Sequence, residues 1–197
     1  NAGMGLAVIA HRAAQALVAR LLREPDGTTE FKILRALGRM RADQPRLPLD
    51  PEPVRAYIHR AVGDAVRYTR LGARLDSEPA DAPSAGLLRE LLEEKRGHAI
   101  ERVFRALGIL YPTADLRSVH DAITSEDDER QGAAREILED LLAVDVRIPL
   151  LEMIDRKVDQ ELRMIDRRDD QPEASYTDLI AALLVDPSDS LRCVAAH

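Results

Sequence analysis

The chain has 197 residues, of which 45% are apolar, so it is long enough to bury the interior of one domain or of a short repeat array. Its net charge of -7 argues against a general affinity for nucleic acids, because an acidic chain repels phosphate backbones. No apolar run approaches the ~20 residues needed to cross a bilayer. Cys193 is the only cysteine, which excludes an intrachain disulfide and suits a reducing compartment.

The apolar content consists mainly of alanine and leucine. The chain contains only 4 tyrosines and 2 phenylalanines, and it has no tryptophan. Alanine and leucine are strong helix formers, whereas strands favour β-branched and aromatic residues. The composition therefore predicts an all-α protein.

Apolar residues recur with helical periodicity along almost the whole chain. Interrupted by prolines and polar loops, the pattern predicts helices over residues 6–22, 28–41, 54–75, 85–110, 114–124, 126–142, 149–168, 176–185 and 188–197. Thr28 or Thr29 is expected to cap the second of these helices, and Thr113 the fifth. Loops are expected at 43–53, which holds four prolines, and at 77–84 and 169–175. No segment predicts a strand, and the two central helices are unusually long.

The spacing of apolar residues also predicts the buried face of each helix. For the second helix these residues are Phe31, Leu34, Leu37 and Met40. For the two long helices they are Val54, Tyr57, Ile58, Ala61, Val62, Ala65, Val66, Ile100, Val103, Phe104 and Leu107. For the helix over 126–142 they are Ala133, Ile137, Leu138, Leu141 and Leu142.

Two turns between helices share a residue pattern at the same spacing. The pattern is an acid, an apolar and a basic residue five and six positions later, and then an alanine. The two copies are Asp26, Phe31, Lys32 and Ala36, and Asp186, Leu191, Arg192 and Ala196. We expect the acid to open the second helix, the apolar residue to enter the core and the basic residue to reach back to the acid. A degraded third copy starts near Glu126.

This pattern resembles HEAT repeats, whose turn commonly reads Asp-Pro, an apolar residue, Arg and Ala. The stretches 31–39 and 87–112 are also similar to bacterial HEAT-repeat regions that follow ADP/ATP-translocase-like membrane domains. The resemblance covers residues 5–197. It implies a HEAT-like (armadillo-like) α-solenoid, an α-α superhelix, and it implies a soluble, cytoplasmic extension of a larger membrane protein. Transport is not implied, because the spanning helices are absent.

The ends of the chain suggest a fragment. Residues 1–4 are expected to be a scar from tag removal and a disordered start, since the chain begins Asn1-Ala2-Gly3 without a methionine. The last predicted helix has no predicted end before His197, the final residue. We therefore expect one solenoid domain over 5–197, truncated at its C-terminus.

No pattern in the sequence predicts catalysis, a cofactor site or a metal site. Glu94 with His98, and Cys193 with His197, each have the spacing of two metal ligands on a helix, but a structural zinc site needs four. Ser118, His120 and Asp121 lie within one helical turn and point in different directions, so they cannot form a relay. These residues are expected to be ordinary surface or half-buried polar groups.

Three basic residues are the candidate partner-binding residues: Lys32, Arg35 and Arg39. They lie on the outer side of the second helix of a repeat, the layer that lines the concave face of a HEAT solenoid. They would mark a site for an acidic partner, although a solvated face is the simpler interpretation. Arg102 and Arg105 have the same ambiguity.

The sequence thus favours a non-catalytic interaction or regulatory module. Its partner would be a protein or another domain of the parent chain, with no nucleic acid bound and no direct insertion into a membrane. Two alternatives remain. One is a HEAT-like alkylpurine DNA glycosylase, which would need a cationic groove and aromatic residues to hold an exposed base. The other is a purely structural spacer between two domains.

Overall fold

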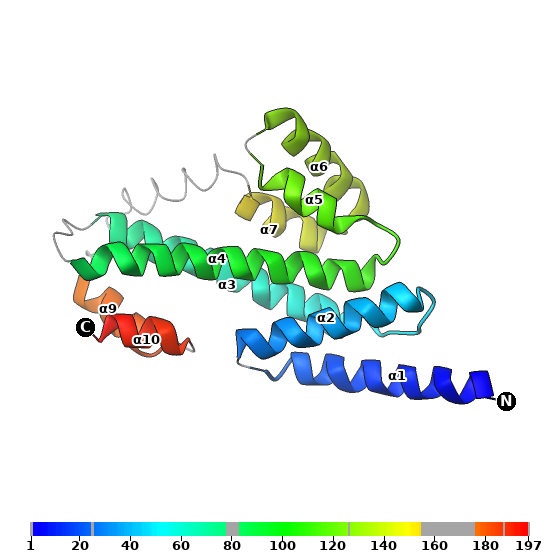
Figure 1. The fold of residues 1–197 in the computed structure, drawn as a ribbon. Helices are drawn as coiled ribbons and strands as arrows, with labels where there is room; N and C mark the ends of the chain where they lie inside the picture. The colour runs from blue at the N-terminus through cyan, green and yellow to red at the C-terminus, as the bar shows by residue number, and fades with distance from the viewer. Residues whose placement is uncertain are drawn as a thin grey trace. The chain divides into compact units, whose positions relative to one another are not determined.

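The computed structural model describes residues 2–24, 26–77, 83–125, 127–154, 176–186 and 188–196. Helices account for most of these residues, and the described part of the chain contains no strand, which confirms the all-α prediction (Figure 1). The helices are α1 (Ala2–Leu21), α2 (Gly27–Asp43), α3 (Pro51–Ser77), α4 (Pro83–Leu110), α5 (Leu116–Ile123), α6 (Asp128–Leu141), α7 (Val144–Ile154), α9 (Tyr176–Leu184) and α10 (Asp189–Ala195). None of them is both long enough and apolar enough to span a membrane.

The elongated central helices are confirmed, with 27 residues in α3 and 28 in α4. The loop predicted between them is shorter than expected. Helix α3 continues to Ser77 and α4 already begins at Pro83, because proline fits the first turn of a helix, where no backbone N–H is needed. The rest of that predicted loop, 78–82, lies outside the described residues, as do 155–175.

The chain divides into two compact units. The first is drawn from residues 1–61 and 101–148, and the second from residues 62–100 and 149–197. The division falls within α3, α4 and α7, so each of these helices contributes to both units. The single domain expected over residues 5–197 stays a prediction.

In the first unit, α1 packs against α2 and α5 packs against α6 (Figure 1). The predicted inner face of the long helices is confirmed here, since Val54, Tyr57, Ile58, Val103 and Leu107 are all buried. These residues recur at helical spacing, which puts them on one side of each helix and removes that side from water.

A polar cluster lies beside this core. Glu30 of α2 accepts a hydrogen bond from the Tyr57 hydroxyl at 3.2 Å, and an Arg60 nitrogen lies 2.5 Å from its carboxylate. Arg60 also donates to the main-chain oxygens of Leu21 and Leu22, each at 2.9 Å. The last carbonyls of a helix have no partner inside it, so Arg60 satisfies the end of α1 and ties it to α2. Arg102 Nε lies 3.3 Å from the other side of the Glu30 carboxylate.

The second unit is built around a separate apolar cluster in which α9 packs against α10. Its fully buried members come from α3, α4, α9 and α10: Leu75, Leu88, Leu92, Leu179, Leu183 and Leu191. Asp186 lies at the turn between α9 and α10 with its side chain only 1% exposed, and it pairs with Arg67 of α3 at 2.5 Å.

Several helix starts differ from the sequence predictions. Helix α3 begins at Pro51 instead of residue 54, and α7 begins at Val144 instead of residue 149. Helix α2 is capped by Asp26, whose carboxylate accepts from the backbone N–H groups of Thr28 and Thr29. This confirms the turn pattern, in which the acid opens the helix, and shows that the predicted threonine cap was wrong. Helix α5 is capped by Asp115 instead of Thr113. Asp186, expected to open α10, is not its N-cap; that position is Ser188. Aspartate is a better N-cap than threonine, which agrees with its place at the start of α2 and α5.

The two turn copies also differ in their apolar and basic residues. Leu191 is fully buried, as expected of the core position, but its counterpart Phe31 is only half-buried. Arg192 does reach back, donating to the main-chain oxygen of Asp186 at 2.7 Å. Lys32 has no hydrogen bond to Asp26, yet its charge contributes to lowering the pKa of that carboxyl after the larger effects of Thr29.

Candidate functional site: a groove with basic walls

A groove of about 530 Å³ lies in the first unit, and we call it the groove. It lies between α2, α4 and α5, closed at one end by the segment that joins α4 to α5. Its volume is within the range of small-molecule and peptide-side-chain sites. Its lining has an apolar part and a charged part.

The apolar lining comes from all three helices and the connecting segment: Leu34, Ala42, Phe104, Pro112, Ala114 and Leu116. Phe104 is held by the edge of the His120 ring, with the ring centroids 4.9 Å apart. Gly38 of α2 and Gly108 of α4 also line the groove, and a Cβ built on either would meet nothing within 4 Å. The groove is therefore open above both glycines.

The wall formed by α4 and α5 has mixed charge. Arg105 donates to Glu101 at 2.8 Å and stacks over the Phe31 ring at 4.1 Å, so its cation already has partners. Ser118 holds the pKa of Asp115 below its usual value through hydroxyl and backbone hydrogen bonds, and Arg117 adds to this effect. Acids and bases on this wall thus largely compensate each other.

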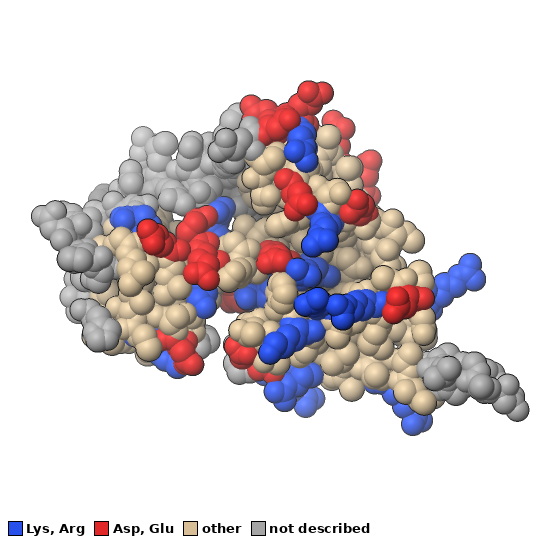
Figure 2. Space-filling view, in the orientation of Figure 1, with Lys and Arg blue, Asp and Glu red and all other residues tan. Residues whose placement is uncertain are grey.

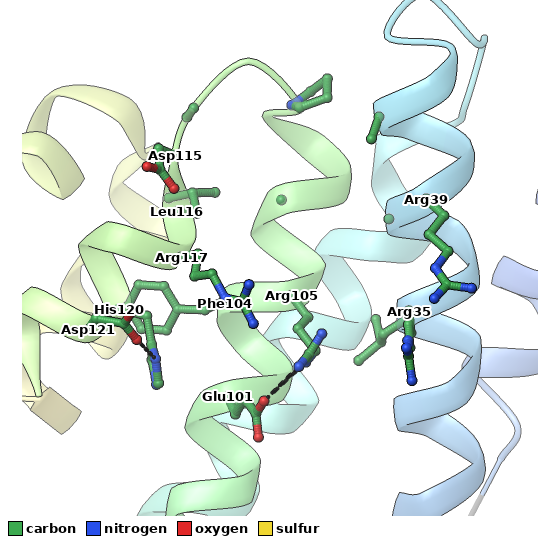
Figure 3. Close-up of a pocket in the computed structure, with 16 residues that line it drawn as sticks. Arg35, Arg39, Glu101, Phe104, Arg105, Asp115, Leu116, Arg117, His120 and Asp121 are labelled. Carbon is green, nitrogen blue, oxygen red and sulfur yellow. Dashed lines mark hydrogen bonds and ion pairs between the residues drawn. The ribbon is translucent and has the colours of Figure 1, made fainter.

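The charged side chains of the α2 wall are all basic. Arg35 and Arg39 lie one turn apart with their guanidinium groups directed the same way along the helix (Figure 3). Both are exposed, and neither forms an ion pair or a hydrogen bond with any described residue. Like charges four residues apart destabilise a helix by about 0.2–0.5 kcal/mol. The two arginines therefore carry a small cost that an anionic ligand would remove.

The three candidate partner-binding residues are only partly brought together. Arg35 and Arg39 line the groove, whereas Lys32 lies outside it, one turn nearer the start of α2. All three are exposed and belong to a run of basic side chains that follows α2 (Figure 2). All three present positive charge to a partner, but only Arg35 and Arg39 do so beside the groove.

The structure explains one of the two arginines, Arg102 and Arg105, whose role the sequence left open. Arg102 is 12% exposed and faces Glu30, so it belongs to the polar cluster and not to a solvated or partner-binding face. Arg105 does line the groove, paired with Glu101. Sequence reasoning missed Arg117, which projects from α5 toward α4 (Figure 3). The signal was available in part, because Leu116, Val119 and Ile123 place the apolar side of α5 inward and leave Arg117 outside.

The polar pairs weighed from the sequence are placed as follows. Ser118 donates its hydroxyl to Asp115 at 2.7 Å, while His120 Nδ1 lies 3.6 Å from Asp121, so the serine is directed away from the histidine. Glu94 and His98 lie 3.8 Å apart on the surface of α4. His197 lies outside the described residues, and within them no three such side chains gather as metal ligands would.

Comparison of the chain with protein-family profiles, with curated proteins and with solved structures finds no match. The chemistry of the groove therefore has to be argued from its own residues. Guanidinium forks bind carboxylates and phosphates in two-point contacts, and a wall with two unpaired forks is suited to an anion.

Proposed function

We propose that this chain is a non-catalytic, HEAT-like interaction module that binds an acidic segment of a protein partner, or of another domain of its parent protein, along α2. The observation that carries the proposal is that the guanidinium groups of Arg35 and Arg39 beside the groove have no partner among the described residues. Lys32 extends the same charge by one turn. A partner carboxylate would relieve the repulsion between these cations and gain charge-assisted hydrogen bonds.

The solenoid arrangement is part of the proposal. What supports it is that helices adjacent in sequence pack in pairs within each compact unit, α1 with α2, α5 with α6 and α9 with α10. Short helix pairs bury their apolar faces by stacking on neighbouring pairs, and the stack leaves an extended surface open for binding. The turn pattern at Asp26 and Asp186 supports the same reading.

A partner protein fits the charges better than a nucleic acid does. The groove holds Glu101, Asp115 and Asp121 close to its arginines, and the whole chain has a net charge of -7, so a long phosphate backbone would be repelled on most sides. Phe104, the aromatic residue of the groove, is 5% exposed and offers no face for base stacking.

The test is identification of proteins retained from the native host by the immobilised chain. The double variant Arg35→Glu/Arg39→Glu is compared with Arg12→Glu/Arg23→Glu, which changes two other exposed arginines and produces the same net charge. The proposal expects one identified protein with an acidic segment to be retained by wild type and control, and lost with the α2 variant. Equal retention by all three chains would contradict it.

Attachment to a membrane domain rests on the sequence resemblance, and we keep it within the proposal. Fractionation of the native host with an antibody to this chain is the direct test. A band much larger than 21.9 kDa in the membrane pellet supports a cytoplasmic extension of a membrane protein. A free band near that mass in the supernatant contradicts it.

A further inference from the structure

We propose that the groove, and not the outer surface of α2 alone, receives the partner, and that its ligand is an acidic peptide with one apolar anchor side chain. This inference rests on the proposed function and specifies the ligand class. It assigns the carboxylates of the peptide to Arg35 and Arg39 and the anchor to the open space above Gly38 and Gly108.

The open space of the groove lies beside two glycines. Gly38 lies between Arg35 and Arg39 in the sequence of α2, and Gly108 faces the same groove from α4. Neither would meet another atom within 4 Å if it carried a Cβ, so neither glycine is required for close packing of the two helices. Each leaves room for a ligand atom in the groove that Arg35 and Arg39 also line.

The lining around the open space is partly apolar. The accessible apolar surface of the groove comes from Ala42, which is exposed, and from Pro112 and Ala114, which are half-buried. Leu34, Phe104 and Leu116 lie beneath this surface, and each is at most 5% exposed. Sites of this size bind ligands through apolar contact area, with a few polar groups that set orientation. An apolar side chain would cover this surface, while charges along the same peptide would meet the arginines.

The two walls of the groove differ in charge. On the α2 wall, Arg35 and Arg39 have no partner among the described residues. On the opposite wall Asp115 caps α5 and offsets the nearby charge of Arg117, and Glu101 is paired with Arg105. A peptide with its acids on one side of the anchor would therefore be held in one orientation. A phosphate backbone has anionic charge at every step and would gain nothing from this asymmetry.

The test uses fluorescence anisotropy with short labelled peptides: a glutamate-rich peptide with one central leucine, the same peptide with alanine there, and an oligothymidylate of equal charge. Wild type is expected to bind the leucine peptide about tenfold more tightly than the alanine peptide, the effect of burying a leucine side chain. Gly38→Leu and Gly108→Leu fill the open space and are expected to weaken binding at least about tenfold. Gly132→Leu is the matched control, because this exposed glycine of α6 also has nothing within 4 Å.

The outcomes separate the two proposals. If Arg35→Glu/Arg39→Glu abolishes binding while both groove-filling variants bind like wild type, the partner lies on the outer face of α2; the groove inference fails and the interaction module stands. Equal affinity for the two peptides, or no binding of either, also overturns the inference. Preference for oligothymidylate overturns both proposals. Hydrogen exchange of the wild type with and without the leucine peptide needs no variant, and it must show added protection in both 27–43 and 101–123.

Discussion

An Arg60 nitrogen lies 2.5 Å from the carboxylate of Glu30, a side chain that is only 9% exposed and belongs to a helix 30 residues earlier in the chain. The same carboxylate accepts from Tyr57 and faces Arg102, so three side chains of α3 and α4 meet on one acid of α2. Burial, followed by the nearby charge of Glu30, raises the pKa of Tyr57, which keeps its hydroxyl protonated as the donor. This cluster positions the helix that carries the basic wall of the groove.

Replacement of Glu30 by glutamine is expected to be strongly destabilising. The change leaves Arg102, which is 12% exposed, facing a neutral group, and breaking a buried ion pair from one side costs about 3–5 kcal/mol. Glu52→Gln is the control, because Glu52 pairs with Arg55 on the surface at 71% exposure, where a pair contributes about 0–1 kcal/mol. Urea unfolding measures both. Similar losses for the two variants would show that the cluster does not stabilise α2.

Alanine at Gly38 is expected to stabilise the protein, and alanine at Gly27 to destabilise it. Gly38 lies within α2 with open space at its Cβ position, so the gain is the ~0.5–1 kcal/mol by which alanine exceeds glycine in a helix. A Cβ on Gly27 would lie 3.0 Å from the Arg102 guanidinium, which Glu30 holds in place. Thermal unfolding of both variants provides the check. A gain at Gly27 would mean that Arg102 moves aside easily.

Stability is expected to fall in acid through the two capping aspartates. Hydrogen bonds from Thr29 to Asp26, and from Ser118 to Asp115, lower the pKa of each carboxyl below the ordinary 3.8. A depressed pKa in the folded state contributes stability that is present above 3.8 and is lost as the pH falls through the folded value. Asn caps a helix as well as Asp but does not titrate here. In the variant Asp26→Asn/Asp115→Asn, the melting temperature should therefore decrease less steeply as the pH falls below 3.8. If the decrease were as steep as in wild type, other carboxyl groups would be responsible for it.

The sequence predicted well which segments are helical, because helical periodicity depends on residues that are close together in the chain. Residues such as Val54, Tyr57 and Ile58 repeat at i, i+3 and i+4, and all three are buried. Helix α6 shows where this reasoning fails: Ile137 is 48% exposed and Ala133 is exposed, while Ala134 and Leu138 are buried. The apolar side of a helix is wider than the area that one neighbouring helix covers. The sequence does not indicate which part of that side remains exposed to solvent. Val66, Phe31 and Met40 are likewise only half-buried.

The groove required information that no single helix contains. Arg35 and Arg39 were recognisable as a basic face of α2, but Arg117 joins them only because α5 packs near α4 and α2. Likewise, Arg102 and Arg105 are three residues apart on one helix and looked equivalent. Because the two residues lie at different angles around α4, Arg102 faces Glu30, whereas Arg105 stacks over Phe31 at the groove.

In the second unit, Asp186 is expected to hold α9 and α10 onto α3. Its carboxylate pairs with Arg67 and accepts from the Ser188 backbone N–H at 2.7 Å. Burial alone would lower the pKa of Arg67, yet the charge and hydrogen bond of Asp186, together with the charges of Tyr68 and Asp64, outweigh it and the pKa is raised. Asp186→Asn should cost about 3 kcal/mol, the low end for a buried pair, since Arg67 is 39% exposed and can recover water. Hydrogen exchange should quicken in 176–184 and 189–195, with little change in α1 and α2, because these segments belong to different compact units. Uniform quickening in both units would show that they unfold together and that the pair supports the whole chain.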